Sequence, residues 1–197
     1  MASLGPVLRN RLNAQRTYSP LLRREQFKHA RTDSIPKWDQ IPYKSKTDIR
    51  KSYEFDFSIG EGAEGIVLSG CEKENDTPIA AKLVSLKHDI TSFALLESKL
   101  LAATNHAAVP LVLDLFQDDD YIYIIQEYVR GKPLFDLMAE DNITEEESKI
   151  ITYQLLDLLD YLHQNGVVHG DIKPENIIFN RKTQKIYLLD FGSAQTL

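Results

Sequence analysis

Two short polar segments near the C-terminal end restrict the possible folds of this chain more than any other part of its sequence. The first runs from His169 to Asn176 and reads His-Gly-Asp-Ile-Lys-Pro-Glu-Asn, and the second, Asp190-Phe191-Gly192, begins 14 residues after Asn176. A capped turn or a surface lysine would explain any one of these residues. Taken together they bring carboxylates, a lysine and an amide into a short stretch of chain, and these are the groups that phosphate and Mg²⁺ chemistry requires.

The chemistry of phosphoryl transfer assigns each of these groups a role. A carboxylate positions the attacking hydroxyl, a neighbouring cation stabilises the charge that builds on the transferred group, and oxygen ligands hold Mg²⁺ while leaving room for phosphates. We therefore predict that Asp171 and Lys173 are catalytic and that Asn176 and Asp190 are metal ligands.

Upstream, the sequence Gly60-x-Gly62-x-x-Gly65 indicates a turn whose backbone can approach phosphates closely, because glycine has no Cβ. Such spacing alone is also typical of an ordinary hairpin turn. A dinucleotide-binding turn would need a helix directly after the last glycine, whereas residues 66–68 are Ile-Val-Leu and indicate a strand. We therefore predict a β-hairpin that covers a ligand.

The rest of the domain alternates between strand and helix patterns. Residues 53–57 alternate aromatic and acidic side chains, as in a half-buried strand. A long helix is predicted from Thr144, whose hydroxyl forms a capping box with Glu147, to Gly166. The further predicted elements are strands at 77–85, 111–116 and 121–127, a helix at 90–103 and a short helix from Leu134.

Charge divides the chain into two parts. Residues 1–51 contain 12 Lys or Arg and four Asp or Glu, whereas residues 52–197 contain 11 and 25, so the net charges are +8 and −14. The first part also contains four prolines and no sustained apolar period. We predict that residues 1–51 are a largely disordered basic arm, which is able to fold back on the acidic domain by an attraction that salt weakens. A solvated linker is the alternative for this arm, and residues 1–24, with five arginines and no acidic residue, also fit a mitochondrial transit peptide.

Composition excludes several kinds of protein. The apolar stretches are far shorter than the roughly 20 residues of a membrane-spanning helix. We expect no signal peptide, because no apolar core segment follows Met1, and the single cysteine, Cys71, rules out an internal disulfide. We expect a cytoplasmic protein in a reducing compartment, with a cytoskeletal or sarcomeric place as a further option. We expect neither a membrane nor a nucleic acid as its partner.

In this order, the glycine-rich hairpin, a strand lysine, His169–Asn176 and Asp190-Phe191-Gly192 resemble the motifs of the eukaryotic-type serine/threonine protein kinases. The resemblance covers about Tyr53 to Leu197. It implies an α+β fold, in which an N-lobe of antiparallel sheet plus one helix (residues 52–130) precedes the beginning of a helical C-lobe (residues 131–197). It also implies binding of ATP and Mg²⁺ and transfer of the γ-phosphoryl group to protein hydroxyls.

The resemblance extends to individual nucleotide-binding positions. Lys82 would hold the α- and β-phosphates and pair with Glu97, whose apolar neighbours leave its charge in need of a partner. Gln126 would be the gatekeeper residue, with backbone groups of Glu127 and Val129 offered to adenine. The predicted nucleotide-binding set is Ile59, Gly60, Gly62, Gly65, Val67, Ala80, Lys82, Glu97, Gln126, Glu127 and Val129.

A rival family shares part of the catalytic segment. The sequence His-Gly-Asp is also common in small-molecule kinases of the aminoglycoside and choline type, but Lys173 and the pair Phe191-Gly192 favour a protein kinase. Within the protein kinases, the segments around Asn176 and Asp190 are most similar to the calcium/calmodulin-related branch. In that branch they resemble the myosin light chain kinases and the kinase domains of titin and obscurin.

Four features depart from the family pattern. Gly170 replaces the arginine that usually pairs with a phosphorylated activation loop, so control by such phosphorylation is not expected. Glu61 and Glu64 place carboxylates near the phosphates, where each would weaken ATP binding. Pro133 replaces an acidic residue after the hinge, and the sequence stops five residues after Gly192, before any activation segment.

The last of these features leaves three interpretations open. The chain is an active serine/threonine kinase, a pseudokinase-like scaffold that holds nucleotide without transferring phosphate, or a fragment of a larger kinase of the muscle type. We also expect the long helix from Thr144 to expose apolar surface that a partner would cover.

Overall fold

The computed structural model describes residues 43–62, 65–86, 91–140 and 143–196. All described residues belong to one compact unit of the chain. The predictions for residues 1–42 and for Glu64 lie outside the described residues.

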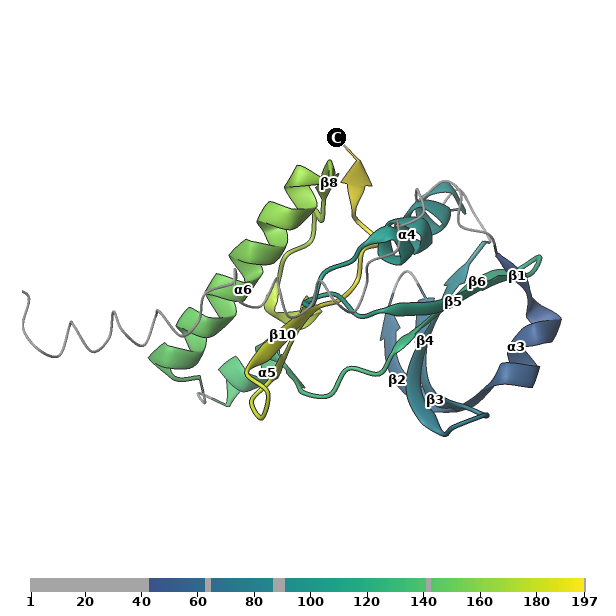
Figure 1. Cartoon of the computed structure of the whole chain (residues 1–197), viewed down its shortest axis with the longest axis horizontal. Coiled ribbons are helices and arrows are strands. Elements are labelled where there is room, and N and C mark those ends of the chain that lie inside the picture. Colours follow the sequence, from purple (N-terminus) through teal and green to yellow (C-terminus); the bar gives the residue numbers. More distant parts are fainter. Residues whose placement is uncertain (1–42, 63–64, 87–90, 141–142, 197) are drawn as a thin grey trace, which may run out of the picture. The chain divides into compact units, whose positions relative to one another are not determined.

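A six-stranded sheet forms the first half of this unit (Figure 1). Its strands lie in the order β1-β5-β6-β4-β3-β2, and neighbours are antiparallel except for the parallel pair β1 and β5. One helix, α4 (Thr91–Ala103), contacts β4, β5 and β6. The strands are β1 (Lys44–Ser45), β2 (Tyr53–Gly62), β3 (Gly65–Glu72), β4 (Thr77–Ser85), β5 (Val112–Gln117) and β6 (Tyr121–Glu127). The α+β fold and its largely antiparallel N-terminal sheet are as predicted.

The sheet separates two hydrophobic cores, because its strands alternate their side chains between two faces. In β6, Ile122 and Ile124 enter the larger core, which also contains residues of α4 and of the C-terminal half. Tyr123 and Ile125 of the same strand enter a smaller core on the outer face. The inner face is therefore the one from which the sheet can present side chains to the C-terminal half.

The smaller core includes a helix that the sequence analysis did not predict. Residues 43–51, assigned there to the disordered basic arm, contain β1 and most of the helix α3 (Lys46–Ser52). Ile49 of this helix lies in the core with only 2% of its surface exposed. This helix has seven residues and buries one side chain against the sheet. A single apolar residue makes no repeating pattern, so the sequence gives no sign of the helix. The prediction of a disordered arm is wrong for these residues.

The expected attraction between the basic segment and the acidic domain is present in β1 and α3. Lys44 forms an ion pair with Asp114 of β5, and the Lys46 ammonium lies 2.7 Å from the carboxylate of Asp118. Both lysine side chains remain about half exposed, so these pairs orient the segment on the sheet more than they stabilise the fold.

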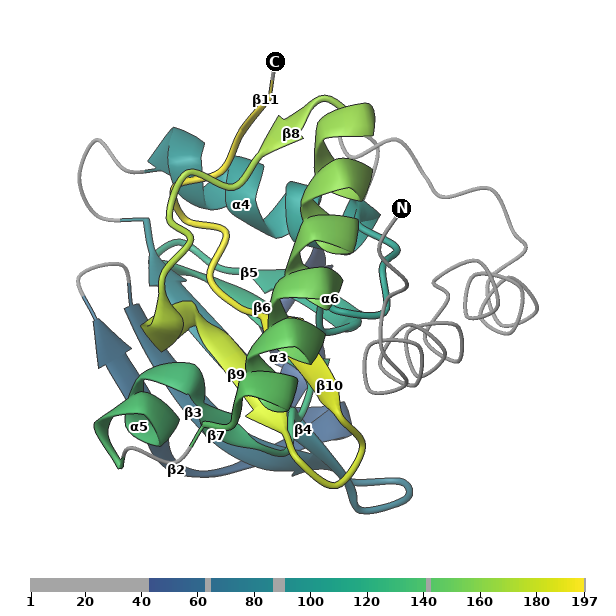
Figure 2. The same ribbon diagram turned by 90° about the vertical axis from the view of Figure 1, so that its left-hand side faces the viewer.

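The second half of the unit is built around the long helix α6 (Glu145–Gln164), which runs beside the hairpin of β9 (Ile177–Asn180) and β10 (Lys185–Leu188) (Figure 2). Helices α3 and α6 lie on opposite sides of the six-stranded sheet (Figure 1). Strands of two to four residues were not predicted here, because segments that short show no recognisable alternation. The remaining elements are β7 (Lys132–Pro133), α5 (Leu134–Ala139), β8 (Val167–Val168), the 3₁₀ helix η2 (Pro174–Asn176) and β11 (Gln195–Thr196).

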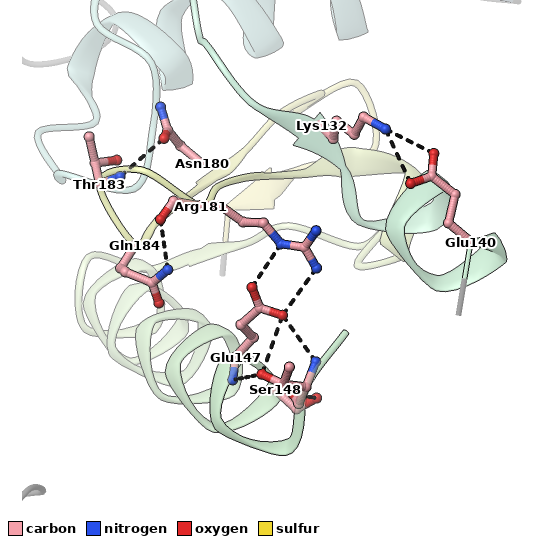
Figure 3. A network of polar contacts seen from close by, with 9 residues as sticks. Lys132, Glu140, Glu147, Ser148, Asn180, Arg181, Thr183 and Gln184 are labelled. Atoms are coloured by element: carbon pink, nitrogen blue, oxygen red, sulfur yellow. Dashed lines mark hydrogen bonds and ion pairs between the residues drawn. The ribbon is translucent and has the colours of Figure 1, made fainter. Parts of the chain in front are cut away.

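The predicted capping box begins α6 (Figure 3). The Glu147 amide donates to Oγ1 of Thr144 at 3.1 Å, and the Glu147 carboxylate accepts the Thr144 amide at 3.0 Å. Arg181, in the turn between β9 and β10, donates to the same carboxylate through Nε at 2.7 Å. The hydrogen bonds from Arg181 and from the Thr144 amide lower the pKa of Glu147. One carboxylate thus joins the start of the helix to the hairpin.

The long helix buries one side and exposes another. Ile151, Leu158 and Leu162 lie in the larger core, whereas Tyr153 and Leu156 are 44% and 60% exposed. Apolar side chains are thus exposed on this helix, as predicted.

Candidate active site

The lysine predicted to bind phosphate lies on the inner face of the sheet. In β4, Ala81 is buried in the outer core, so the alternation of the strand turns Ala80 and Lys82 to the opposite face. There the Lys82 ammonium lies 2.5 Å from Oε1 of Glu97 in α4 and 2.7 Å from Oδ1 of Asp190. Residues separated from Lys82 by 15 and by 108 positions therefore meet at one amine.

Burial makes the charges of this cluster depend on one another. The side chains of Glu97 and Lys82 are 2% and 12% exposed, whereas that of Asp190 is 39% exposed. Burial by itself would lower the pKa of Lys82, but the carboxylates of Glu97 and Asp190 outweigh it and raise this pKa above its usual range. Lys82 is therefore a cation that two carboxylates orient, which is the state that binding of a phosphate requires.

The predicted catalytic residues Asp171 and Lys173 form a hydrogen-bonded unit with Asn176. The Lys173 ammonium lies 2.6 Å from Oδ2 of Asp171, and Nδ2 of Asn176 donates to the same oxygen at 2.9 Å and to the Asp171 carbonyl at 3.0 Å. The hydrogen bond from Lys173 is the main cause that lowers the pKa of Asp171, and the same bond raises the pKa of Lys173. Both groups are therefore charged at neutral pH.

His169 joins this loop to the segment that carries Asp190. Its Nε2 lies 3.2 Å from the carbonyl oxygen of Leu189, and its Nδ1 accepts the amide of Asp171 at 3.3 Å. Since a carbonyl accepts and an amide donates, the ring is neutral with its proton on Nε2, and burial lowers its pKa in agreement. The ring also packs edge-on against Phe191. His169 is a positioning residue that the predicted set missed, although it begins the motif.

The backbone of Asp190 adopts a conformation that is uncommon for a residue with a side chain. Its φ of 59° lies in the left-handed region, and such residues cluster at functional sites. The Leu189 amide, directly before it, donates to the carbonyl of Asn176 at 2.8 Å. Besides the Lys173 hydrogen bond that lowers it, the pKa of Asp171 responds to the charge of Asp190, which raises it. The two polar segments of the sequence are thus one connected unit.

The glycine-rich segment forms the predicted hairpin of β2 and β3. In it, Gly62 is paired with Gly65 and Gly60 with Val67. A Cβ on Gly65 would lie 2.0 Å from the carbonyl oxygen of Leu83 in β4, so packing requires this glycine. A Cβ on Gly60 would meet Val67 at 3.7 Å, an ordinary contact, so packing gives no reason for glycine there. A ligand that approaches the backbone closely would provide one.

Three more predicted positions surround Lys82. Gln126 in β6 is paired with Ala80 in β4, and Val67 in β3 is paired with Lys82 itself. Paired residues project their side chains to the same face of a sheet, so all of these lie on the inner face. Ile59 of β2 is 44% exposed, which leaves its side chain accessible to a ligand.

The two predicted hinge residues after β6 differ in what they can offer a base. The amide of Glu127 donates to the carbonyl of Leu111 at 2.9 Å, and the Glu127 carboxylate accepts the Leu111 amide at 3.1 Å. The Glu127 amide is therefore already used inside the protein. Within the described ranges Val129 makes no backbone hydrogen bond, so its amide and carbonyl remain for a base.

The predicted metal ligands suit Mg²⁺ in their chemistry. Because the contacts of Asn176 with Asp171 use Nδ2, they leave its Oδ1 as an acceptor, and Asp190 adds a partly exposed carboxylate. Mg²⁺ is usually held by one or two carboxylates together with substrate phosphates. In the part of the chain that the structure describes, no three His, Cys, Asp or Glu side chains gather into a metal cage. The donor set therefore fits a metal that arrives with phosphates.

This chain belongs to the protein kinases, because residues 53–197 match the protein kinase domain family. It is 32% identical over 164 residues to a probable myosin light chain kinase of Dictyostelium discoideum and 36% identical over 145 residues to a second one. These alignments cover 79% and 73% of this chain but only 42% and 46% of the relatives. A striated muscle preferentially expressed protein kinase of Danio rerio is 35% identical over 72% of this chain and 5% of that protein. The predicted family resemblance is confirmed.

Proposed function

We propose that this chain binds MgATP and transfers the γ-phosphoryl group of ATP to serine or threonine hydroxyls of a protein. The observation that carries the proposal is that the carboxylates of Glu97 and Asp190 both contact the Lys82 amine. The ion pair of Asp171 and Lys173 belongs to the same connected unit as Asp190. Membership of the protein kinase family supports the same reaction. Because the chain spans less than half the length of the first two curated relatives, the activity of the whole protein is part of the proposal.

In this proposal each charged group has one task. Lys82 binds the α- and β-phosphates, and its contact with Glu97 holds the amine toward them. Asp171 is ionised, so it accepts a hydrogen bond from the attacking hydroxyl and aligns that oxygen with the γ-phosphorus. Lys173 stabilises the negative charge of the transferred group. Asn176 and Asp190 hold Mg²⁺, which when bound neutralises charge on the phosphates.

Replacement of Asp171 by asparagine tests the proposal, because it removes the charge and keeps the size of the side chain. We expect the original chain to show a thermal shift with MgATP and to transfer labelled phosphate to serine and threonine peptides. Asp171→Asn should keep the thermal shift, while its transfer rate falls by a factor of about 10²–10⁴.

Asp160→Asn is the control, since Asp160 lies on the exposed side of α6 and should leave both measurements unchanged. A chain that shows no shift with MgATP would contradict the proposal, and so would equal transfer by Asp171→Asn and the original chain. A shift without any transfer would contradict the enzyme and favour the scaffold interpretation.

The glycine hairpin provides a second test of nucleotide binding. We expect Gly60→Ala to leave the free energy of unfolding nearly unchanged, because its Cβ makes only an ordinary contact with Val67. The same variant should weaken MgATP binding about tenfold, equivalent to about 1.4 kcal/mol, by keeping phosphate away from the backbone. Gly65→Ala is the contrast, because it should lose stability through its clash with the Leu83 carbonyl. Titration calorimetry measures the affinity, and unchanged affinity in a stable Gly60→Ala would show that the hairpin does not contact the nucleotide.

The names of the relatives favour a protein substrate in the cytoskeleton. Two are probable myosin light chain kinases and one is a striated muscle kinase, so we infer a cytoplasmic place with a cytoskeletal or sarcomeric association. Among the described helices none combines the length and the apolar character needed to cross a bilayer. A protein partner over the exposed apolar side of α6 stays a prediction.

A further inference from the structure

Tyr43, directly before β1, reaches across to the helix that carries Glu97. Its hydroxyl oxygen lies 2.6 Å from Oγ of Ser98 in α4, and Oγ of Ser98 donates to the carbonyl of Leu95 at 3.0 Å. The Tyr43 hydroxyl also lies 3.5 Å from the same Leu95 carbonyl, and either hydroxyl can be the donor between Tyr43 and Ser98. Ser98 has no exposed surface, so this bond is shielded from water. A residue far from the phosphate-binding motifs is thus hydrogen-bonded to the neighbour of Glu97.

This bond and the ion pair of Glu97 hold α4 at two adjacent residues. Successive residues of an α-helix project roughly 100° apart, so Glu97 and Ser98 face different partners from adjacent positions. Glu97 faces Lys82 at 2.5 Å, and Ser98 faces Tyr43 at 2.6 Å. The Lys99 ammonium lies 5.8 Å from the centroid of the Tyr43 ring, which adds a weaker contact on the same side. If α4 turned so as to withdraw Glu97 from Lys82, Ser98 would leave Tyr43.

Tyr43 is itself held in place by the sheet. The next two residues pair with β5 in parallel register, Lys44 with Phe116 and Ser45 with Gln117. Helix α3 then buries Ile49 in the outer core. The tyrosine is therefore attached to the rigid sheet at its backbone and to α4 at its hydroxyl.

We propose that Tyr43 is a positioning residue, which holds α4 in the rotation that brings Glu97 to Lys82. The importance of Tyr43 for phosphate transfer rests on the proposed function. Its effect on the contact between Lys82 and Glu97 does not, because that contact exists in the chain without nucleotide.

The test measures how often the Lys82 amine leaves its carboxylates. The nucleotide-free chain is treated with an amine-acylating reagent, and mass spectrometry follows the rate at Lys82 relative to the exposed Lys182. Only the released amine reacts, so the rate reports the opened population. Tyr43→Phe keeps the ring and removes the hydroxyl. Loss of one hydrogen bond of typical net strength should raise the population with a released Lys82 amine about fivefold. We therefore expect the acylation rate of Lys82 to rise about fivefold in Tyr43→Phe.

Tyr53→Phe is the matched control. Its hydroxyl donates to Oδ2 of Asp114 at 2.8 Å, so this variant loses a comparable hydrogen bond next to the same N-terminal segment. That bond does not touch α4, and we expect the acylation rate of Lys82 to stay unchanged. An equal rise in both variants would show a general loss of stability and would overturn the proposal, as would an unchanged rate in Tyr43→Phe.

Combined variants test whether the effect passes through Ser98 and Glu97. Ser98→Ala should raise the rate at Lys82 by itself. Adding Tyr43→Phe should then raise it by much less than fivefold, because only the 3.5 Å contact of Tyr43 with the Leu95 carbonyl is left to lose. In the background of Glu97→Gln, Tyr43→Phe should have no effect. Effects that multiply in either background would overturn the proposal. Failure of MgATP to bind the original chain would contradict the proposed function and leave this comparison of acylation rates valid.

Discussion

We expect replacement of Lys82 by methionine to abolish phosphate transfer and to lower the free energy of unfolding by about 3–5 kcal/mol. The Glu97 carboxylate is 2% exposed, and the variant removes the cation that lies 2.5 Å from it. A buried carboxylate that loses its cation keeps the cost of its desolvation. Asp190 is 39% exposed, so water replaces the lost contact there at less cost. Urea unfolding followed by circular dichroism measures the change.

A second substitution separates stability from activity at this site. In Lys82→Met/Glu97→Leu both charges are replaced by apolar side chains of similar size, and we expect stability within about 1–2 kcal/mol of the original protein. The double variant should still transfer no phosphate, because the phosphate-binding cation is absent. Lys132→Met is the control, since Lys132 and Glu140 form an ion pair that is 57% and 45% exposed and contributes less than about 1 kcal/mol. A loss in Lys82→Met as small as that in Lys132→Met would contradict this account of the buried pair.

We expect Gly170→Ala to lower the free energy of unfolding by about 3 kcal/mol, and Gly166→Ala by about 1 kcal/mol. Both glycines have a left-handed backbone, with φ of 80° and 70°. A Cβ on Gly170 would lie 2.6 Å from the carbonyl oxygen of Ser193, whereas a Cβ on Gly166 would meet nothing within 4 Å. Gly166→Ala therefore measures the cost of the backbone conformation alone, and the difference between the two variants measures the clash.

Equal losses in the two alanine variants would show that Ser193 moves aside easily. The expected clash gives a physical reason for the absence of the arginine that protein kinases usually have at position 170. Pairing of β11 with β8, at Gln195 and Val168, brings the segment after Gly192 back to the loop that carries Asp171. A side chain at position 170 would displace that segment. Glycine at position 170 thus lets the segment that contains Ser193 pack against the loop that holds Asp171.

The local arrangement of side chains was predictable where the groups lie close together along the chain, while their catalytic and metal-binding roles stay predictions. Asp171, Lys173 and Asn176 were predicted from chemistry and spacing, and the structure joins them in one hydrogen-bonded unit. The capping box at Thr144 was predicted for the same reason, since its two partners are three residues apart. The pairing of Lys82 with Glu97 was inferred from family resemblance, and the structure brings these residues together.

Prediction failed where a short segment depends on distant partners. Helix α3 buries Ile49 alone, and the strands of the C-terminal half are two to four residues long, so neither has a period to recognise. The bond between Tyr43 and Ser98 joins positions 55 residues apart and leaves no local pattern. The hydrogen bond from the Glu127 amide to the Leu111 carbonyl likewise joins separate parts of the chain, and the use of Glu127 by a base stays a prediction.

Residue types and their local spacing were enough to predict the family, the order of the motifs and the identity of the charged groups. Only the folded structure shows that Asp190 also meets the Lys82 ammonium, that packing requires Gly65 and that residues 43–52 belong to the fold. Those properties come from contacts between segments that are distant in sequence, and such contacts form only when the sheet buries its two faces in separate cores.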